Sequence, residues 1–92
     1  LEDFNNYFKK CINKEYRESF DILININNKG YSVIDILDDI TNYIKIYSNM
    51  SDENKYKIIK VISKYIYIFN DKHEDNIELI FFTNNIIKIL NA

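Results

Sequence analysis

Hydrophobic residues recur every three to four positions along most of the chain, the spacing that places them on one face of an α-helix. Five segments carry this pattern, and short polar stretches separate them. With their capping residues they run from about Glu2 to Ile12, Asn13 to Gly30, Ser32 to Tyr47, Ser51 to Asp71, and His73–Asp75 to Leu90. Because every connection is short, consecutive helices are expected to pack antiparallel. The pattern predicts an all-α fold, a single five-helix bundle with mostly antiparallel neighbours.

Each of the first three helices has one apolar stripe that is expected to face the core. The stripes comprise Phe4, Phe8 and Cys11 in the first helix, Tyr16, Phe20 and Leu23 in the second, and Val33, Leu37, Ile40, Ile44 and Tyr47 in the third. The opposite face of the second helix is polar and consists of Lys14, Glu18, Asp21, Asn25 and Asn28. These helices therefore have the amphipathic pattern of a domain surface.

The predicted helix ends carry residues that favour starts and stops. Asn13 is a candidate N-cap for the second helix, because its side chain can accept a hydrogen bond from the first turn. Gly30 is expected to end that helix, since glycine adopts a left-handed conformation at little cost. Ser32, with Asp35 three residues later, predicts the start of the third helix, and Ser51 that of the fourth. Gly30, Ser32 and Ser51 are thus the predicted structural residues.

The last two helices are apolar on more than one face. The fourth has a polar face of Lys57, Lys60, Lys64, Tyr67 and Asp71, and two apolar faces of Ile59, Ile62, Ile66 and Phe69 and of Ile58, Val61, Tyr65 and Ile68. The fifth has stripes of Leu79, Phe82, Ile86 and Leu90 and of Ile77, Ile80 and Ile87, with Phe81 among polar neighbours. One apolar stripe is enough for a helix on a domain surface.

Two interpretations account for this surplus. In one, the fourth helix is central and its own chain covers both apolar faces. In the other, which the sequence favours, the surplus is a subunit interface. The predicted interface residues are Ile58, Val61, Tyr65, Ile68, Phe81 and Phe82, with Tyr65, Ile68, Phe81 and Phe82 as its anchors.

Composition narrows the possible functions. One glycine and no proline exclude glycine-rich phosphate loops. The net charge of −2 argues against a dedicated nucleic-acid surface, and a single cysteine excludes an internal disulfide. The longest apolar runs are far shorter than the ~20 residues of a membrane span, so no membrane partner is expected. The chain starts at Leu1 already in an amphipathic pattern, which suggests a piece of a longer protein.

No catalytic, cofactor-binding or metal-binding site is predicted. His73 lies beside acidic residues at a helix start, where capping is the simpler role. Cys11 lies on an apolar stripe with no base nearby in sequence, as a buried structural cysteine does. Asp38 and Asp39 point about 100° apart on a helix and do not converge on one atom. We therefore expect that this chain by itself is not an enzyme.

A resemblance to a known family rests on one segment above all. Asn28 to Ile36 is similar to the Gly-Tyr-Ser-x-x-Asp-Ile segment in small subunits of replication factor C, the eukaryotic clamp loader. Cys11-Ile12-Asn13 resembles the Cys-Val-Asn of subunit 2, and weaker similarities lie at 50–62 and 76–79. The family tends to have glycine where Lys72 follows Asp71 and often has a basic residue in place of Ile68. The chain most resembles the C-terminal collar domain of subunit 2.

The resemblance implies a function for the whole chain, 1–92, as the collar domain of a longer AAA+ subunit. Such a domain would join its counterparts from the other subunits in a heteropentamer that loads the sliding clamp onto primer-template DNA in the nucleus. ATP and Mg²⁺ would bind upstream of Leu1. Two alternatives stay open: a helical adaptor for a partner helix or peptide, and a nucleic-acid-binding module that uses Lys57, Lys60 and Lys64.

Overall fold

The computed structural model describes residues 2–46, 49–71 and 77–92, and these form five α-helices without a strand. The helices are α1 (Glu2–Ile12), α2 (Tyr16–Asn28), α3 (Val33–Ile46), α4 (Asp52–Asp71) and α5 (Ile77–Leu90). The predicted all-α fold is confirmed. The start predicted for the fifth helix, at His73–Asp75, and the inward position predicted for Tyr47 lie outside the described residues.

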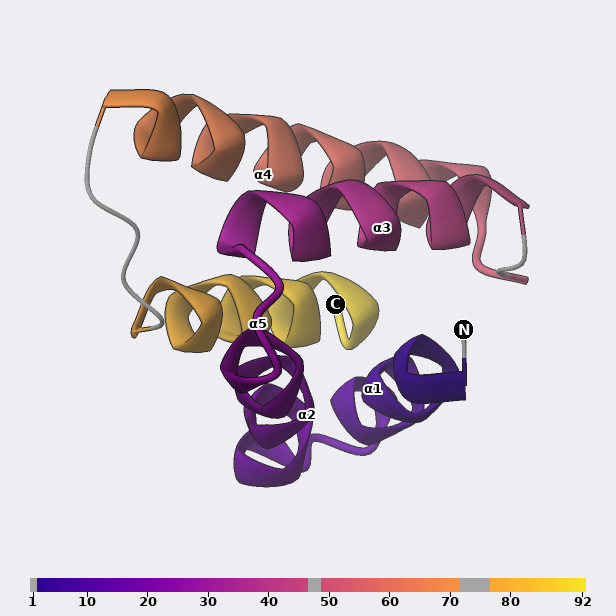
Figure 1. The fold of residues 1–92 in the computed structure, drawn as a ribbon. Coiled ribbons are helices and arrows are strands. Elements are labelled where there is room, and N and C mark those ends of the chain that lie inside the picture. The colour runs from indigo at the N-terminus through magenta and orange to yellow at the C-terminus, as the bar shows by residue number, and fades with distance from the viewer. Residues whose placement is uncertain (1, 47–48, 72–76) are drawn as a thin grey trace.

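The helices pack around α5, which contacts α1, α2 and α4. Figure 1 shows α3 and α4 side by side and antiparallel, with α5 running antiparallel to α4 beneath them. α1 and α2 lie on the other side of α5, and α2 crosses α5 steeply. The predicted antiparallel packing therefore holds for the pairs α3–α4 and α4–α5, whereas α2 departs from it.

The buried face of each helix follows the predicted stripes closely. Buried residues from the prediction are Phe4, Phe8, Cys11, Leu23, Val33, Leu37, Ile40 and Ile44. In α2 two predicted inward residues differ: the Tyr16 side chain is 48 % exposed, and Phe20 is only partly buried. The buried face of α2 is centred on Ser19 and Leu23, and Tyr16 and Phe20 lie to one side of it. The prediction that Tyr16 faces the core was therefore wrong. Tyr7, which the prediction left out, is fully buried.

The connection from α1 to α2 corrects the predicted N-cap at Asn13. The Asn13 amide bonds back to the Lys9 carbonyl, so this residue still belongs to the end of α1. The Lys14 and Glu15 amides then bond to the Cys11 and Lys10 carbonyls, the pattern of a Schellman motif. Lys14 takes the left-handed position of that motif with φ of +60°.

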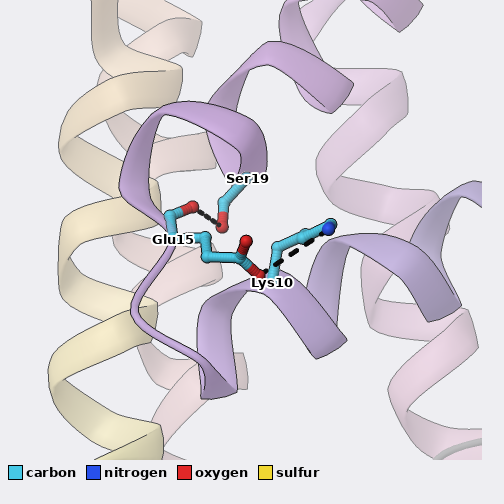
Figure 2. A network of polar contacts seen from close by, with 3 residues as sticks. All are labelled: Lys10, Glu15 and Ser19. Carbon is cyan, nitrogen blue, oxygen red and sulfur yellow. Dashed lines mark hydrogen bonds and ion pairs between the residues drawn. The ribbon is translucent and has the colours of Figure 1, made fainter.

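The start of α2 is set by Glu15, whose side chain makes no capping bond. Its carbonyl accepts the Ser19 amide and, at 2.6 Å, the Ser19 hydroxyl. Its carboxylate lies 3.6 Å from the Lys10 ammonium (Figure 2). The turn is therefore held by backbone bonds of α1, and the asparagine side chain that suggested a cap is not needed for it.

The helix ends predicted at Gly30, Ser32 and Ser51 are confirmed. Gly30 follows α2 with φ of +110°, and its amide bonds to the Asn27 carbonyl. The Ser32 hydroxyl accepts the Asp35 amide at 3.0 Å, and the Ser51 hydroxyl accepts the Asn54 amide at 3.2 Å. Each of the two serine bonds satisfies one of the backbone donors that a helix start leaves without a partner.

Candidate functional site

The two apolar faces of α4 are largely covered by the chain itself. α3 and α5 both pack against α4, and between them they bury Ile58, Ile62, Tyr65 and Phe69. The flanking residues of the two faces are partly buried; they are Ile59, Val61, Ile66 and Ile68. Most of the extra apolar residues on α4, which suggested a subunit interface, therefore line the core that α4 shares with α3 and α5.

Three of the six predicted interface residues lie inside this core. Ile58 is fully buried and Phe82 is 1 % exposed, so neither reaches the surface. The Tyr65 ring meets the Phe82 ring edge to face, with centroids 5.7 Å apart, and its hydroxyl accepts a 3.2 Å hydrogen bond from the Asn85 amide group. The side chains of these three residues pack within the domain. The prediction that Ile58, Tyr65 and Phe82 form an interface was therefore wrong, and they are core residues.

The remaining predicted interface residues keep accessible surface. Phe81 on α5 is 50 % exposed, and Val61 and Ile68 on α4 are partly buried. Ile77, one helical turn before Phe81, is 47 % exposed and was not among the predicted interface residues. Residues four apart share a helix face, so Ile77 and Phe81 form an apolar pair on the outside of α5. The prediction placed Ile77 in a stripe with Ile80 and Ile87 and did not pair it with Phe81, although their i, i+4 spacing was a signal that could have found the pair.

The predicted polar face of α4 is confirmed as a solvent-facing one for its described members. Lys57, Lys60, Lys64 and Tyr67 are all exposed. The Lys57 ammonium pairs with the Glu53 carboxylate at 3.2 Å, one helical turn earlier. Exposed pairs of this kind contribute little to stability, about 0.3–0.5 kcal/mol. The face therefore stays cationic and hydrated, and it borders a groove that also contains Ile89 of α5.

A polar cluster that sequence reasoning missed lies within the core between α1, α2 and α5. The Tyr7 hydroxyl and the Thr83 hydroxyl are 2.9 Å apart and share a hydrogen bond. Cys11 and Ser19 lie in the same cluster, and both are fully buried. The periodicity predicted that Cys11 would be buried, and this is confirmed. No local pattern pairs a hydroxyl on the first helix with one on the last.

Burial keeps this cluster uncharged. It raises the pKa of the Cys11 thiol to about 11, because a thiolate would be stripped of water, while bonds to Ser19 and Tyr7 oppose the rise. Burial likewise raises the pKa of the Tyr7 hydroxyl well above its ordinary value. A reactive cysteine needs a lowered pKa and access to a substrate. The cluster is therefore part of the packing of the domain and lacks the features of a nucleophile site.

Other candidate chemistry gains no support from the described residues. Asp38 and Asp39 are exposed on α3, as expected for a solvated helix face. Within residues 2–46, 49–71 and 77–92, no three His, Cys, Asp or Glu side chains gather as metal ligands. His73 and its acidic neighbours Glu74 and Asp75 lie outside those ranges. None of the described helices combines the length and the hydropathy that a membrane crossing requires.

Comparison with known proteins gives one match. The family model of the replication factor C C-terminal domain matches residues 2–80, which include α1 to α4 and the first turn of α5. Searches of curated proteins and of solved structures give no match. The matched region contains the Gly30–Ile36 segment on which the resemblance rested, and it covers most of the chain. The chain belongs to the replication factor C C-terminal domain family.

Proposed function

We propose that this chain is the collar domain of a replication factor C small subunit and that it works by joining the other subunits of the clamp loader. The observation that carries the proposal is the family match over residues 2–80, which covers four complete helices of the bundle. The Cys11-Ile12-Asn13 segment favours subunit 2 among the small subunits. An assembly role also agrees with a core that holds its polar groups neutral and paired.

The contact with a neighbouring subunit is proposed to centre on the apolar pair Ile77 and Phe81. Both side chains are about half exposed although they are large and apolar, and they lie on one face of α5. Burying the exposed part of such side chains on association favours binding by roughly 1 kcal/mol each. Aromatic side chains often supply the largest part of an interface energy. Ile68 is proposed to border the same contact from α4.

The proposed role in the whole complex follows from this assembly. The chain is proposed to hold an upstream AAA+ module, which binds ATP and Mg²⁺, in a ring with its counterparts. That ring would load the sliding clamp onto primer-template DNA in the nucleus. In this proposal the domain positions the ATP-binding modules relative to one another and contributes no catalytic group of its own.

Co-expression with the other subunits of replication factor C tests the proposal. We expect the 92-residue chain to elute from a size-exclusion column together with those subunits at equal stoichiometry. A chain that stays separate from all of them, although circular dichroism shows it to be helical, would contradict the proposed function. An unrelated helical bundle of similar size and charge serves as the control for nonspecific association.

A further inference from the structure

A groove of about 410 Å³ between α4 and α5 has no role in the assembly proposed above. Its lining residues are Lys57, Lys60, Val61, Lys64 and Ile89. The two apolar members come from different helices and are both partly buried. Ile89 also lies outside residues 2–80, so the family match does not cover this groove completely.

The groove combines an apolar floor with a cationic rim. Val61 and Ile89 form the floor, and the three lysines stand on one face of α4 at helical spacing. Lys57 already pairs with Glu53. Among the residues that the structure describes, Lys60 and Lys64 form no ion pair. Two ammonium groups beside an apolar floor are therefore available to anionic groups of a partner.

Charge complementarity and the apolar floor together define the partner. A phosphodiester backbone would satisfy the lysines but offers no apolar group to Val61 and Ile89. An amphipathic helix satisfies both, because it can place an apolar side chain and flanking carboxylates on one face. The net charge of the chain is −2, so an acidic partner is drawn to this face and not to the surface as a whole.

We propose that the groove between α4 and α5 binds an acidic amphipathic helix of a partner protein. An apolar side chain of that helix packs on Val61 and Ile89, and its carboxylates pair with Lys60 and Lys64. The proposal does not depend on assembly with clamp-loader subunits, since Ile89 lies near the end of α5, whereas Ile77 and Phe81 lie in its first turns.

The probe is a synthetic peptide of about 18 residues, long enough to form a helix, with leucine at every third or fourth position and glutamate between. It is titrated into the ¹⁵N-labelled chain of 92 residues and followed by amide chemical shifts. We expect shifts concentrated on residues 57–64 and on Ile89, and weaker binding as salt is added. The variant with Lys60→Glu and Lys64→Glu should bind at least about tenfold more weakly.

Matched controls separate the proposal from its rivals. Lys88→Glu changes a lysine on an exposed position of α5 outside the groove, and it should leave the affinity within about twofold. A peptide with serine in place of leucine should lose most of its affinity. Equal binding of the serine peptide, shifts elsewhere on the domain, or no shifts at millimolar peptide would each overturn the proposal. So would tighter binding of a single-stranded oligothymidine to the same residues.

Discussion

Tyr7 on α1 and Thr83 on α5 are 76 positions apart in sequence, yet their hydroxyl groups share a 2.9 Å hydrogen bond inside the core. Both residues are fully buried, so their hydroxyl groups lose their hydrogen bonds to water on folding. The bond between them replaces those lost hydrogen bonds. Asn91, directly after α5, adds a second link to α1, because its side-chain amide donates to the Cys11 carbonyl at 3.2 Å. The two ends of the chain are thus joined by polar contacts as well as by packing.

Removing the Thr83 hydroxyl should lower the free energy of unfolding more than removing the Tyr7 hydroxyl does. Thr83→Val leaves the buried Tyr7 hydroxyl with only the Cys11 thiol, a weak hydrogen-bonding group, as its partner, and we expect a loss of about 1–3 kcal/mol in the free energy of unfolding. Tyr7→Phe leaves a threonine, whose hydroxyl can bond to the backbone of its own helix, so about 1 kcal/mol is expected. Urea unfolding measures both. Tyr56→Phe, at an exposed tyrosine, is the control, and equal stability of all variants would refute the bond's contribution.

The left-handed residue Lys14 identifies a position where a substitution should stabilise the domain. A side chain at φ of +60° is strained, whereas glycine adopts this conformation freely. Lys14→Gly is therefore expected to raise the free energy of unfolding by about 0.5–1 kcal/mol. Gly30→Ala is the inverse experiment: φ is +110°, and a Cβ there would meet no atom, so backbone strain alone should destabilise the domain by about 1 kcal/mol.

A fall in stability on Lys14→Gly, or none on Gly30→Ala, would contradict this account of the two turns. Thermal unfolding followed by circular dichroism is sufficient for the comparison. Lys29→Gly provides a control next to Gly30, because Lys29 has an ordinary negative φ of −78°. Glycine there should destabilise the end of α2.

The buried thiol predicts how stability depends on pH at the alkaline end. Burial raises the pKa of Cys11 to about 11 from an ordinary value near 9, so the folded chain holds this proton more tightly than the unfolded chain does. The stabilisation is complete below about pH 9 and is lost as the pH rises from there through about 11. At about pH 10 the expected loss is on the order of 1 kcal/mol relative to neutral pH.

Urea unfolding at neutral pH and at about pH 10, in the parent chain and in Cys11→Ala, measures this loss. The variant is less stable at neutral pH because it leaves a small cavity. It should nevertheless show a smaller decline on going to alkaline pH, while the buried Tyr7 still contributes to the decline in both proteins. An identical decline in the two proteins would show that the thiol is not the group that titrates.

The periodicity was enough to predict the five helices, and three residues located the end of α2 and the starts of α3 and α4. Ser32, Ser51 and Gly30 act through bonds within a few residues of themselves, so their roles could be read locally. The predicted N-cap at Asn13 was wrong because the turn is instead formed by Lys14 in the left-handed conformation after α1. No sequence signal marks that conformation at Lys14. Lysine is not a residue that the left-handed conformation favours.

The division of α4 between core and surface could not be predicted in the same way. Ile58 and Tyr65 have the spacing of an apolar face, but only the tertiary packing decides whether α5 or another molecule covers that face. Phe81 and Phe82 are adjacent and chemically identical, yet one is half exposed and the other is buried. Their positions differ by about 100° around the helix, and the sequence does not state which of the two directions leads into the core.

That pair of phenylalanines provides the most direct test of the proposed assembly. Phe81→Asp should abolish co-purification of the chain with the other replication factor C subunits while circular dichroism stays unchanged, because the side chain reaches the surface. Phe82→Asp should instead unfold the domain, since it buries a charge. Tyr56→Asp, at an exposed aromatic residue of α4, should leave both properties unchanged. A folded Phe81→Asp variant that still enters the complex at full stoichiometry would contradict the account.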